Sequence, residues 1–241
     1  MDEIKYEIVN RKRIATYFSS GIGDIKKIVI MSHGFRGSSL GPARQFVDFQ
    51  RILNEKGYSV LRFDQPNSGN SEGDYLDSSF KEWVETTTFF ANKYFSQGYA
   101  VALLGQSMGA TTTVIAVNQP EIKDKISCIL LWVPDAKSTV NHKSEEIFEE
   151  GAQKYKGKFW LEARDCDFFK CLDEFKGGIH LVYGEFDKYV EKEIIRKTID
   201  MVKGKGFEVI RLKGQDHSPW TFDLVQTVYK KELKVLDRYL G

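Results

Sequence analysis

One stretch of the chain decides its fold, Leu103-Leu104-Gly105-Gln106-Ser107-Met108-Gly109-Ala110. An apolar run leads into a serine with one glycine two positions before it and another two positions after it. This pattern is typical of a nucleophile elbow, where the chain leaves a strand, turns sharply at the serine and enters a helix. Gly105 and Gly109 have no Cβ, so neighbouring backbone can pass close to the turn. The stretch therefore predicts that the Ser107 hydroxyl stands clear at the carboxyl end of a strand.

The length and charge of the chain suit a globular domain without a nucleic-acid partner. The chain has 241 residues, which is enough for one α/β domain with a sizeable core. Its 35 basic and 34 acidic side chains nearly cancel and form no long single-sign run, so composition gives no support for nucleic-acid binding. We expect residues 1–241 to form a single domain.

Targeting signals and metal-ligand patterns are not visible in the sequence. The first residues include no apolar run or small-residue cleavage site, and no window approaches the length of a membrane span. Cys128, Cys166 and Cys171 are odd in number and have no metal-ligand spacing with the four histidines. We therefore expect three reduced thiols in a cytoplasmic protein, with no disulfide and no metal.

Apolar runs and helical spacings alternate from Lys27 to the end of the chain. After a hairpin over 4–9 and 13–18, strands are predicted over 27–31, 58–63, 100–104, 127–133, 179–183 and 207–212. Helices are predicted over 46–57, from the capping box Ser79-Phe80-Lys81-Glu82 onward, and over 110–118, 191–202 and 220–239. This alternation predicts one mostly parallel, doubly wound sheet.

The alternation breaks between residues 134 and 172, after the sixth strand. This segment mixes charges, glycines and aromatic side chains, and it is too aromatic for a disordered linker. We interpret it as a small cap insertion that packs over the sheet edge. Its aromatic side chains either line an apolar pocket or only fix the insertion to the sheet, and the sequence favours neither alternative.

Residues that could take part in catalysis or binding follow the predicted strands at their carboxyl ends. In an open sheet of this kind, the loops at that edge form the binding site. The residues that fall there are His33-Gly34-Phe35, Asp64, Ser107, Asp135, Asp187 and His217.

These motifs and their order resemble those of the α/β-hydrolase family, in which the serine, the acid and the histidine follow one another along the chain. His33-Gly34-Phe35 is similar to the oxyanion motif, and Gly105 to Gly109 to the elbow. Gly184-Glu185-Phe186-Asp187 is similar to the acid turn, and Asp216-His217-Ser218 to the histidine loop. The resemblance covers essentially the whole chain and implies an α/β-hydrolase fold.

Two stretches depart from the family pattern. Phe63 to Gly73 is similar to the family's fourth-strand loop, but Pro66-Asn67 replaces the common Arg-Gly. The acid turn continues with Lys188-Tyr189-Val190-Glu191 where Val-Val-Pro is common, which changes the rim of the site more than the acid itself. Among members, the chain looks most like small bacterial carboxylesterases of the feruloyl esterase-like or monoacylglycerol-lipase-like groups, which carry a modest insertion after the sixth strand.

The resemblance implies a role for each site residue. Ser107 would be the nucleophile, His217 the base that activates it, and Asp187 the acid that holds His217 in the useful tautomer. The backbone N–H groups of Phe35 and Met108 would form the oxyanion hole. No cofactor is implied.

The acid has one rival. Asp135 follows the sixth strand, where some family members place their acid. Asp64 is expected to brace its own loop, Asp216 to point away from His217, and Trp220 to pack at the start of the last helix.

These observations predict a serine carboxylesterase that hydrolyses small to medium acyl or aryl esters through an acyl-enzyme. A thioesterase or a serine peptidase would use the same triad. In a peptidase, carboxylates in the insertion could bind a charged terminus, although a solvated helix face is the favoured interpretation of these residues, Glu145, Glu146, Glu149 and Glu150. A dehalogenase is disfavoured because its elbow needs an aspartate.

A protein of another class, a non-catalytic ligand-binding protein on the same fold, is the remaining alternative. Intact Ser107, Asp187 and His217 disfavour it. The expected partner is thus a small-molecule ester, and the sequence leaves a homodimer open.

Overall fold

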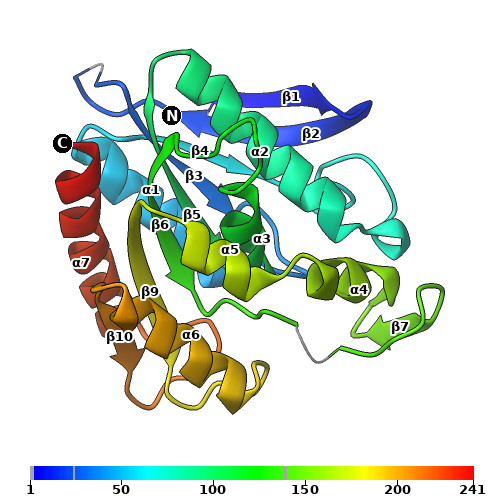
Figure 1. Ribbon diagram of the computed structural model, residues 1–241. Coiled ribbons are helices and arrows are strands. Elements are labelled where there is room, and N and C mark those ends of the chain that lie inside the picture. The colour runs from blue at the N-terminus through cyan, green and yellow to red at the C-terminus, as the bar shows by residue number, and fades with distance from the viewer. Residues whose placement is uncertain (1–2, 24, 138–139) are drawn as a thin grey trace.

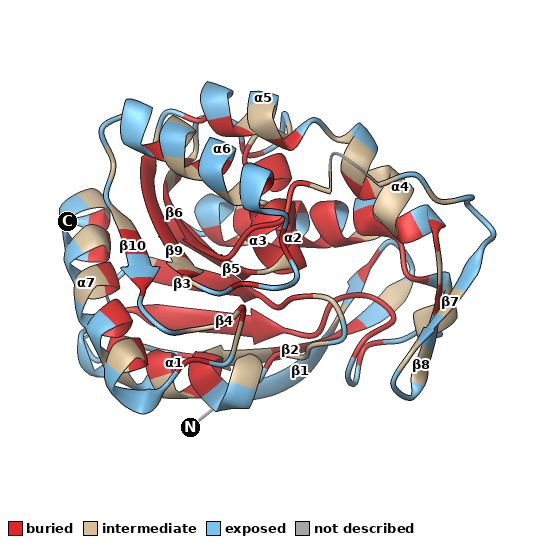
Figure 2. Ribbon diagram, turned by 90° about the horizontal axis from the view of Figure 1, so that it is seen from below, coloured by how far each residue is buried: buried red, intermediate tan, exposed pale blue. Residues whose placement is uncertain are grey.

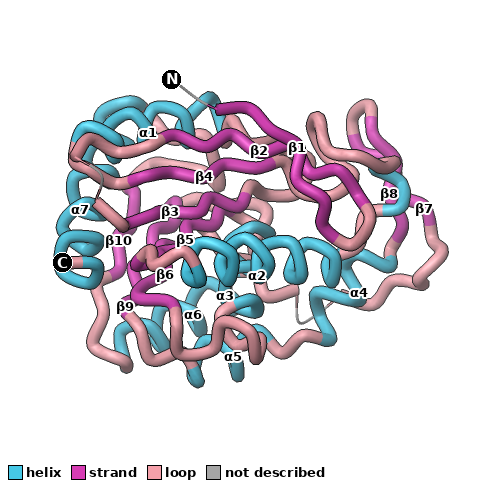
Figure 3. The backbone as a smooth tube through the Cα atoms, turned by 90° about the horizontal axis from the view of Figure 1, so that it is seen from above, coloured by secondary structure: helices cyan, strands magenta, loops and turns pink. Residues whose placement is uncertain are grey.

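The computed structural model describes residues 3–23, 25–137 and 140–241. Its main feature is an eight-stranded sheet with the strand order β1-β2-β4-β3-β5-β6-β9-β10, which Figure 3 shows from above. The strands are β1 (Glu3–Val9), β2 (Lys12–Ser19), β3 (Lys27–Ser32), β4 (Ser59–Phe63), β5 (Ala100–Gln106), β6 (Ile126–Trp132), β9 (Gly178–Gly184) and β10 (Val209–Leu212). The strands from β4 to β10 run parallel, and β1 and β2 form an antiparallel hairpin at one edge. The predicted mostly parallel sheet is therefore confirmed.

Helices cover both faces of the sheet (Figure 1). One face carries α1 (Gln45–Glu55) and α7 (Phe222–Leu240). The other carries α2 (Phe80–Ser96), α3 (Met108–Ala116) and α6 (Lys192–Gly204). Two short 3-10 turns, η1 (Pro42–Arg44) and η2 (Tyr75–Asp77), lie in the loops.

The central strands carry continuous apolar runs because a hydrophobic core lies on each face of the sheet. In β3, Ile28 and Ile30 pack into the core under α2 and α3, whereas Val29 and Met31 pack into the core under α1 and α7. Successive side chains of a strand point to opposite faces, so a strand covered on both sides needs apolar residues at every position. Figure 2 shows these central strands as buried.

The predicted strand and helix boundaries agree with the structure within two residues. The last strand shows why the small differences arise. It was predicted from Phe207, but the Phe207 N–H donates to the Val202 carbonyl at the end of α6, and pairing with β9 begins only at Val209. Hydrophobic pattern alone does not show which backbone groups a preceding helix has already taken.

The predicted capping box at the start of α2 is only half formed. The Ser79 hydroxyl accepts the Glu82 N–H at 3.4 Å, as a helix cap should. The Glu82 carboxylate accepts from Lys12 Nζ of β2 at 2.7 Å rather than turning back to the Ser79 backbone. The Ser79 hydroxyl also donates to Glu162 at 2.7 Å. The cap thus links α2 to the edge hairpin and to the insertion.

The segment after β6 contains β7 (Ile147–Glu150), β8 (Gln153–Lys156), α4 (Lys158–Asp165) and α5 (Phe168–Glu174). Phe159 and Phe168 are buried in the core that α2 and α3 cover. Figures 1 and 2 agree that the β7–β8 hairpin lies at the opposite end of the molecule from α7. The expected solvated helix face is wrong, because Glu149 and Glu150 lie in β7 and the two preceding glutamates lie outside any helix.

The loop after β4 adopts its shape with Asn67 in place of the more common glycine. Asn67 has a φ of 66°, in the left-handed region that asparagine tolerates better than most residues. Asp64 Oδ1 accepts the Ser39 N–H at 2.6 Å, and Asp64 Oδ2 accepts the Asn70 N–H at 2.9 Å. Asp64 therefore braces its own loop, as predicted, and also the loop that follows β3.

Candidate active site

Ser107 occupies a sharp turn between β5 and α3, with φ 54° and ψ −124°. The two glycines permit a close approach that any side chain would block. A Cβ at Gly105 would lie 2.3 Å from the Gly109 carbonyl oxygen, and a Cβ at Gly109 would lie 2.1 Å from that of Ser32. The helix can therefore begin directly behind β3 and β5, as the elbow pattern predicts.

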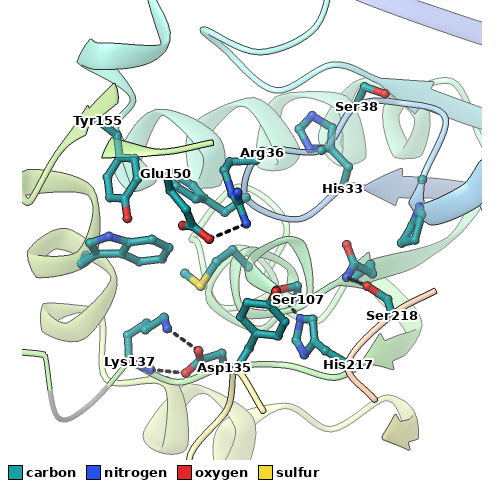
Figure 4. Close-up of a pocket in the computed structure, with 18 of the residues that line it drawn as sticks. His33, Arg36, Ser38, Ser107, Asp135, Lys137, Glu150, Tyr155, His217 and Ser218 are labelled. Atoms are coloured by element: carbon teal, nitrogen blue, oxygen red, sulfur yellow. Dashed lines mark hydrogen bonds and ion pairs between the residues drawn. The ribbon is translucent and has the colours of Figure 1, made fainter. Parts of the chain in front are cut away.

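Ser107, His217 and Asp187 form a hydrogen-bonded chain. His217 Nε2 lies 2.8 Å from Ser107 Oγ, and His217 Nδ1 lies 2.6 Å from Asp187 Oδ2. A carboxylate can only accept, so Nδ1 carries the proton and Nε2 is free to accept the Ser107 hydroxyl proton. Figure 4 shows Ser107 and His217 facing one another at the wall of a cavity.

The acid turn after β9 holds Asp187 rigidly. The Asp187 side chain is fully buried, and its Oδ1 accepts the N–H groups of Tyr189 and Val190 at 2.9 and 3.0 Å. Asp216, next to His217 in sequence, points elsewhere, as predicted. It accepts the His217 backbone N–H at 2.8 Å and pairs with Lys188, whose hydrogen bond lowers the pKa of the Asp216 carboxyl.

The rival acid Asp135 is engaged in other contacts. Its Oδ2 lies 2.5 Å from Lys137 Nζ, and its Oδ1 accepts the Lys137 N–H at 3.1 Å. Its backbone carbonyl accepts the Thr111 hydroxyl at 2.8 Å, which fixes the chain where it leaves β6. The structure thus brings Asp187, and not Asp135, against His217.

Of the two predicted oxyanion donors, Met108 belongs to the elbow and Phe35 to the loop after β3. Met108 is the first residue of α3, where backbone N–H groups have no partner within the helix. Phe35 follows Gly34, whose N–H donates to Gln106 Oε1 at 3.1 Å. The Met108 side chain is buried in the core and also lines the cavity.

His33 positions the loop that carries Phe35. Its Nε2 accepts the Gln65 N–H at 2.9 Å, so its Nδ1 is the protonated nitrogen and donates to the Gly34 carbonyl at 2.8 Å. Burial lowers the pKa of His33, which keeps this ring neutral. His33 therefore acts as a structural tie between two loops and is not available as a base.

A cavity of about 680 Å³ opens in front of Ser107. Its walls carry two ion pairs, Arg36 with Glu150 at 2.7 Å and Lys137 with Asp135, which lie on different sides of the cavity in Figure 4. Tyr155 of the insertion also lines it.

The aromatic side chains of the insertion line the cavity and also fix the insertion in place. Trp160 lines the cavity and packs at a tilt against Phe35 with ring centroids 4.5 Å apart, while the Phe159 ring centroid lies 4.7 Å from that of Phe35 on the core side. Lys137 Nζ lies 4.8 Å from the centre of the Trp160 ring. Neither alternative drawn from the sequence holds alone, because these aromatic side chains have both roles and the cavity that they line also carries ion pairs.

Several site residues were not predicted from the sequence. Gln106 lies inside the elbow pentapeptide and Arg36 directly follows the oxyanion motif, so their positions offered a signal. Tyr189, whose ring centroid lies 5.3 Å from that of His217, occupies the stretch where the acid turn departs from the family pattern. Lys137 carried no local signal, and Glu150 was considered only as one of four carboxylates of the insertion, because the fold decides which partner each side chain meets.

Within the described residues, no group of three or more histidine, cysteine or acidic side chains could hold a metal ion. The three cysteines are free, and burial raises the pKa of the Cys128 thiol. In the same part of the chain, no helix is both long and apolar enough to cross a membrane.

A hydrolase family, described as serine aminopeptidase, S33, has a sequence profile that matches residues 23–164. A search of curated protein sequences gave no match.

Solved structures share the fold at low identity. Est1E from Butyrivibrio proteoclasticus, solved with ferulic acid bound, is 19% identical, with 97% of this chain and 99% of that chain covered and a TM-score of 0.80. The Pyrococcus furiosus esterase Pf2001 is 15% identical, with 100% and 91% covered and a TM-score of 0.71. Mouse alpha/beta hydrolase domain-containing protein 10 is 16% identical, with 98% and 99% covered and a TM-score of 0.76.

Proposed function

Because this chain belongs to the hydrolase family described as serine aminopeptidase, S33, and has the α/β-hydrolase fold, we propose that it is a serine carboxylesterase acting on small to medium acyl or aryl esters. The observation that carries the proposal is the hydrogen-bonded chain from Ser107 Oγ through His217 to Asp187. A serine hydroxyl is a weak nucleophile and needs such an adjacent base.

In the acylation step, Ser107 Oγ attacks the ester carbonyl carbon while His217 Nε2 takes the hydroxyl proton. Asp187 stabilises the imidazolium that results. The carbonyl oxygen becomes an oxyanion and accepts the N–H groups of Phe35 and Met108. The tetrahedral intermediate then collapses, and the alcohol leaves with the proton that His217 returns.

In the deacylation step, water takes the place of the alcohol. His217 removes a proton from this water, which attacks the acyl carbon bound to Ser107 Oγ. Collapse of the second intermediate releases the carboxylic acid and restores the serine. Nothing in this cycle requires a cofactor.

The cavity supports a substrate of modest size with polar as well as aromatic parts. Phe35, Tyr155 and Trp160 offer aromatic surface, and the Arg36–Glu150 and Lys137–Asp135 ion pairs offer charge. A long alkyl chain would have to desolvate these charged groups without replacing their contacts, which is costly. We therefore propose that the segment 134–172 is a cap that restricts the site to short-chain or aryl esters.

A serine peptidase is the second candidate, favoured by the family description and by the Glu150 carboxylate in the cavity. A peptide amine could pair with Glu150 only by competing with Arg36, which already lies 2.7 Å from it. This competition weakens the case for aminopeptidase activity.

A substrate panel tests these alternatives. It comprises p-nitrophenyl esters of increasing acyl length, an aryl ester, an acyl thioester and an aminoacyl p-nitroanilide. We expect kcat/KM for short-chain and aryl esters to exceed that for the long-chain ester and the anilide by at least about 10²-fold. An anilide hydrolysed faster than every ester would replace the esterase assignment with a peptidase.

Gln106 is expected to be a positioning residue. It lies next to Ser107, accepts the Gly34 N–H, and donates from Nε2 to Ser218 Oγ at 3.3 Å, so it joins the oxyanion loop to the histidine loop. We expect Gln106→Leu to lower kcat by about 10²-fold while KM changes little, because the Phe35 donor shifts from its place.

A matched control for this variant is Gln45→Leu, another buried glutamine, which does not line the cavity. Gln45→Leu should leave kcat unchanged even if the protein melts at a lower temperature. A Gln106→Leu enzyme with a raised KM and an unchanged kcat would assign Gln106 to substrate binding instead.

A further inference from the structure

The edge strand β1 exposes a row of large apolar side chains. Ile4, Tyr6 and Ile8 are 65%, 54% and 61% exposed and, at alternate positions, share one face of the strand. Figure 2 shows β1 as largely exposed, and no other strand of the described chain pairs with its outer side. An unprotected edge of this kind is a template for pairing with another strand.

The backbone of the same three residues points outward. Asn10 and Arg11 form a two-residue hairpin turn with φ values of 48° and 69°, so Val9 and Lys12 are a hydrogen-bonded pair and the pairs alternate from there. Ile8, Tyr6 and Ile4 then fall in non-hydrogen-bonded pairs with β2, and their N–H and C=O groups face the free edge.

Contacts on the other side of β2 agree with this assignment. Ala15, the partner of Tyr6, turns its carbonyl away from β1 and accepts the Asp64 N–H at 3.0 Å. Arg13, the partner of Ile8, accepts the Glu72 N–H at 2.8 Å. Tyr6 and Ile8 therefore keep their own backbone groups available at the edge.

We infer that β1 pairs antiparallel with β1 of a second copy of this chain, about a two-fold axis at Tyr6. In this register Tyr6 lies opposite the partner copy's Tyr6, and Ile4 lies opposite the partner copy's Ile8. All of these residues direct their backbone groups outward, so each pair can exchange both hydrogen bonds. The apolar side chains of the two strands then cover one another on one face, and the two sheets become one.

The charges on the other face select this register. It places Lys5 opposite the partner copy's Glu7, twice by symmetry, and opposite charges that face across a strand pair are stabilising. A shift by two residues in either direction would oppose Lys5 to Lys5 or Glu7 to Glu7. Within one copy, Glu7 already lies 2.6 Å from Lys93 and Lys5 lies 2.6 Å from Glu3, so the new pairs extend an existing row of alternating charge.

Reversing the charge of Lys5 or Glu7 tests the proposed dimer. Light scattering after size exclusion should give twice the chain mass for the unaltered protein at about 100 µM, and Lys5→Glu or Glu7→Lys should each raise the dimer dissociation constant at least about tenfold. An equimolar mixture of the two variants restores both opposite-charge pairs, so it should regain a dimer that contains one chain of each kind. Ester hydrolysis by each variant should match that of the unaltered protein.

Two further variants complete the test. Tyr6→Pro removes an outward N–H and should give a monomer, because proline is tolerated where the N–H faces away from the sheet. Glu193→Lys, an exposed charge reversal on α6, should leave the dimer unchanged. A monomeric unaltered protein at about 100 µM, or a dimer that persists in Lys5→Glu and Tyr6→Pro, would overturn the inference.

Discussion

Replacing Ser107 with alanine is expected to lower kcat for a short p-nitrophenyl ester by about six orders of magnitude. In the proposed mechanism the side chain of Ser107 supplies the attacking atom, and its Oγ lies 2.8 Å from His217 Nε2. Without it, water has to attack directly, and only the oxyanion donors and substrate binding remain to accelerate the reaction. Single-turnover measurements at high enzyme concentration would quantify the residual rate.

The fold should survive this substitution. The backbone of the elbow is fixed by the Gly105 and Gly109 contacts and by the Ser107 N–H, which donates to the Trp132 carbonyl at 2.8 Å. Circular dichroism and the melting temperature should therefore be close to those of the unaltered enzyme. Ser38→Ala makes the same truncation elsewhere in the cavity wall and should change kcat by less than about tenfold.

A fluorophosphonate probe separates the enzyme from a non-catalytic binding protein. The probe reacts with an activated serine, so the unaltered protein should be labelled at Ser107 and the Ser107→Ala variant should not. A protein that binds a small ligand but leaves the probe unreacted would argue against catalysis. Full esterase activity in Ser107→Ala would refute the nucleophile assignment itself.

The sheet and the elbow could be predicted because both rest on local backbone constraints. Each strand covered on both faces needs an unbroken apolar run, as in Val29 and Ile30, and such runs are visible without knowing the partner strand. The elbow needs glycines at fixed offsets because a Cβ at Gly109 would meet the backbone of the loop after β3. The order of Ser107, Asp187 and His217 along the chain then indicated the resemblance to the α/β-hydrolase family.

What could not be predicted depends on contacts between distant segments. Glu82 pairs with Lys12 rather than completing a capping box, and Glu150 lies in a hairpin strand where its partner is Arg36. These pairs join residues far apart in sequence, and each forms only where the fold brings its two segments together. The hydrophobic pattern also does not show which of two buried carboxylates, Asp135 or Asp187, lies against His217 in the folded chain.

The second large prediction concerns which carboxylate, Asp187 or Asp135, supports His217. Asp187→Asn is expected to lower kcat by about 10⁴-fold, whereas Asp135→Asn should lower it by less than about tenfold. Measurement of kcat and KM for the same p-nitrophenyl ester across both variants decides between the two acids. The pair is well matched, because each substitution replaces one buried carboxylate that lies at a strand end with its amide.

The contacts of Asp187 explain why the nearly isosteric amide should be so damaging. Oδ1 accepts the N–H groups of Tyr189 and Val190, so the amide oxygen of the variant must occupy that position. Its NH₂ group would then face His217 Nδ1 and donate to it, which moves the ring proton to Nε2. A protonated Nε2 cannot accept the Ser107 proton. At Asp135 the same substitution removes only the ion pair with Lys137 at the cavity wall. If Asp135→Asn lost more than about 10³-fold in kcat and Asp187→Asn lost little, the acid would belong after the sixth strand.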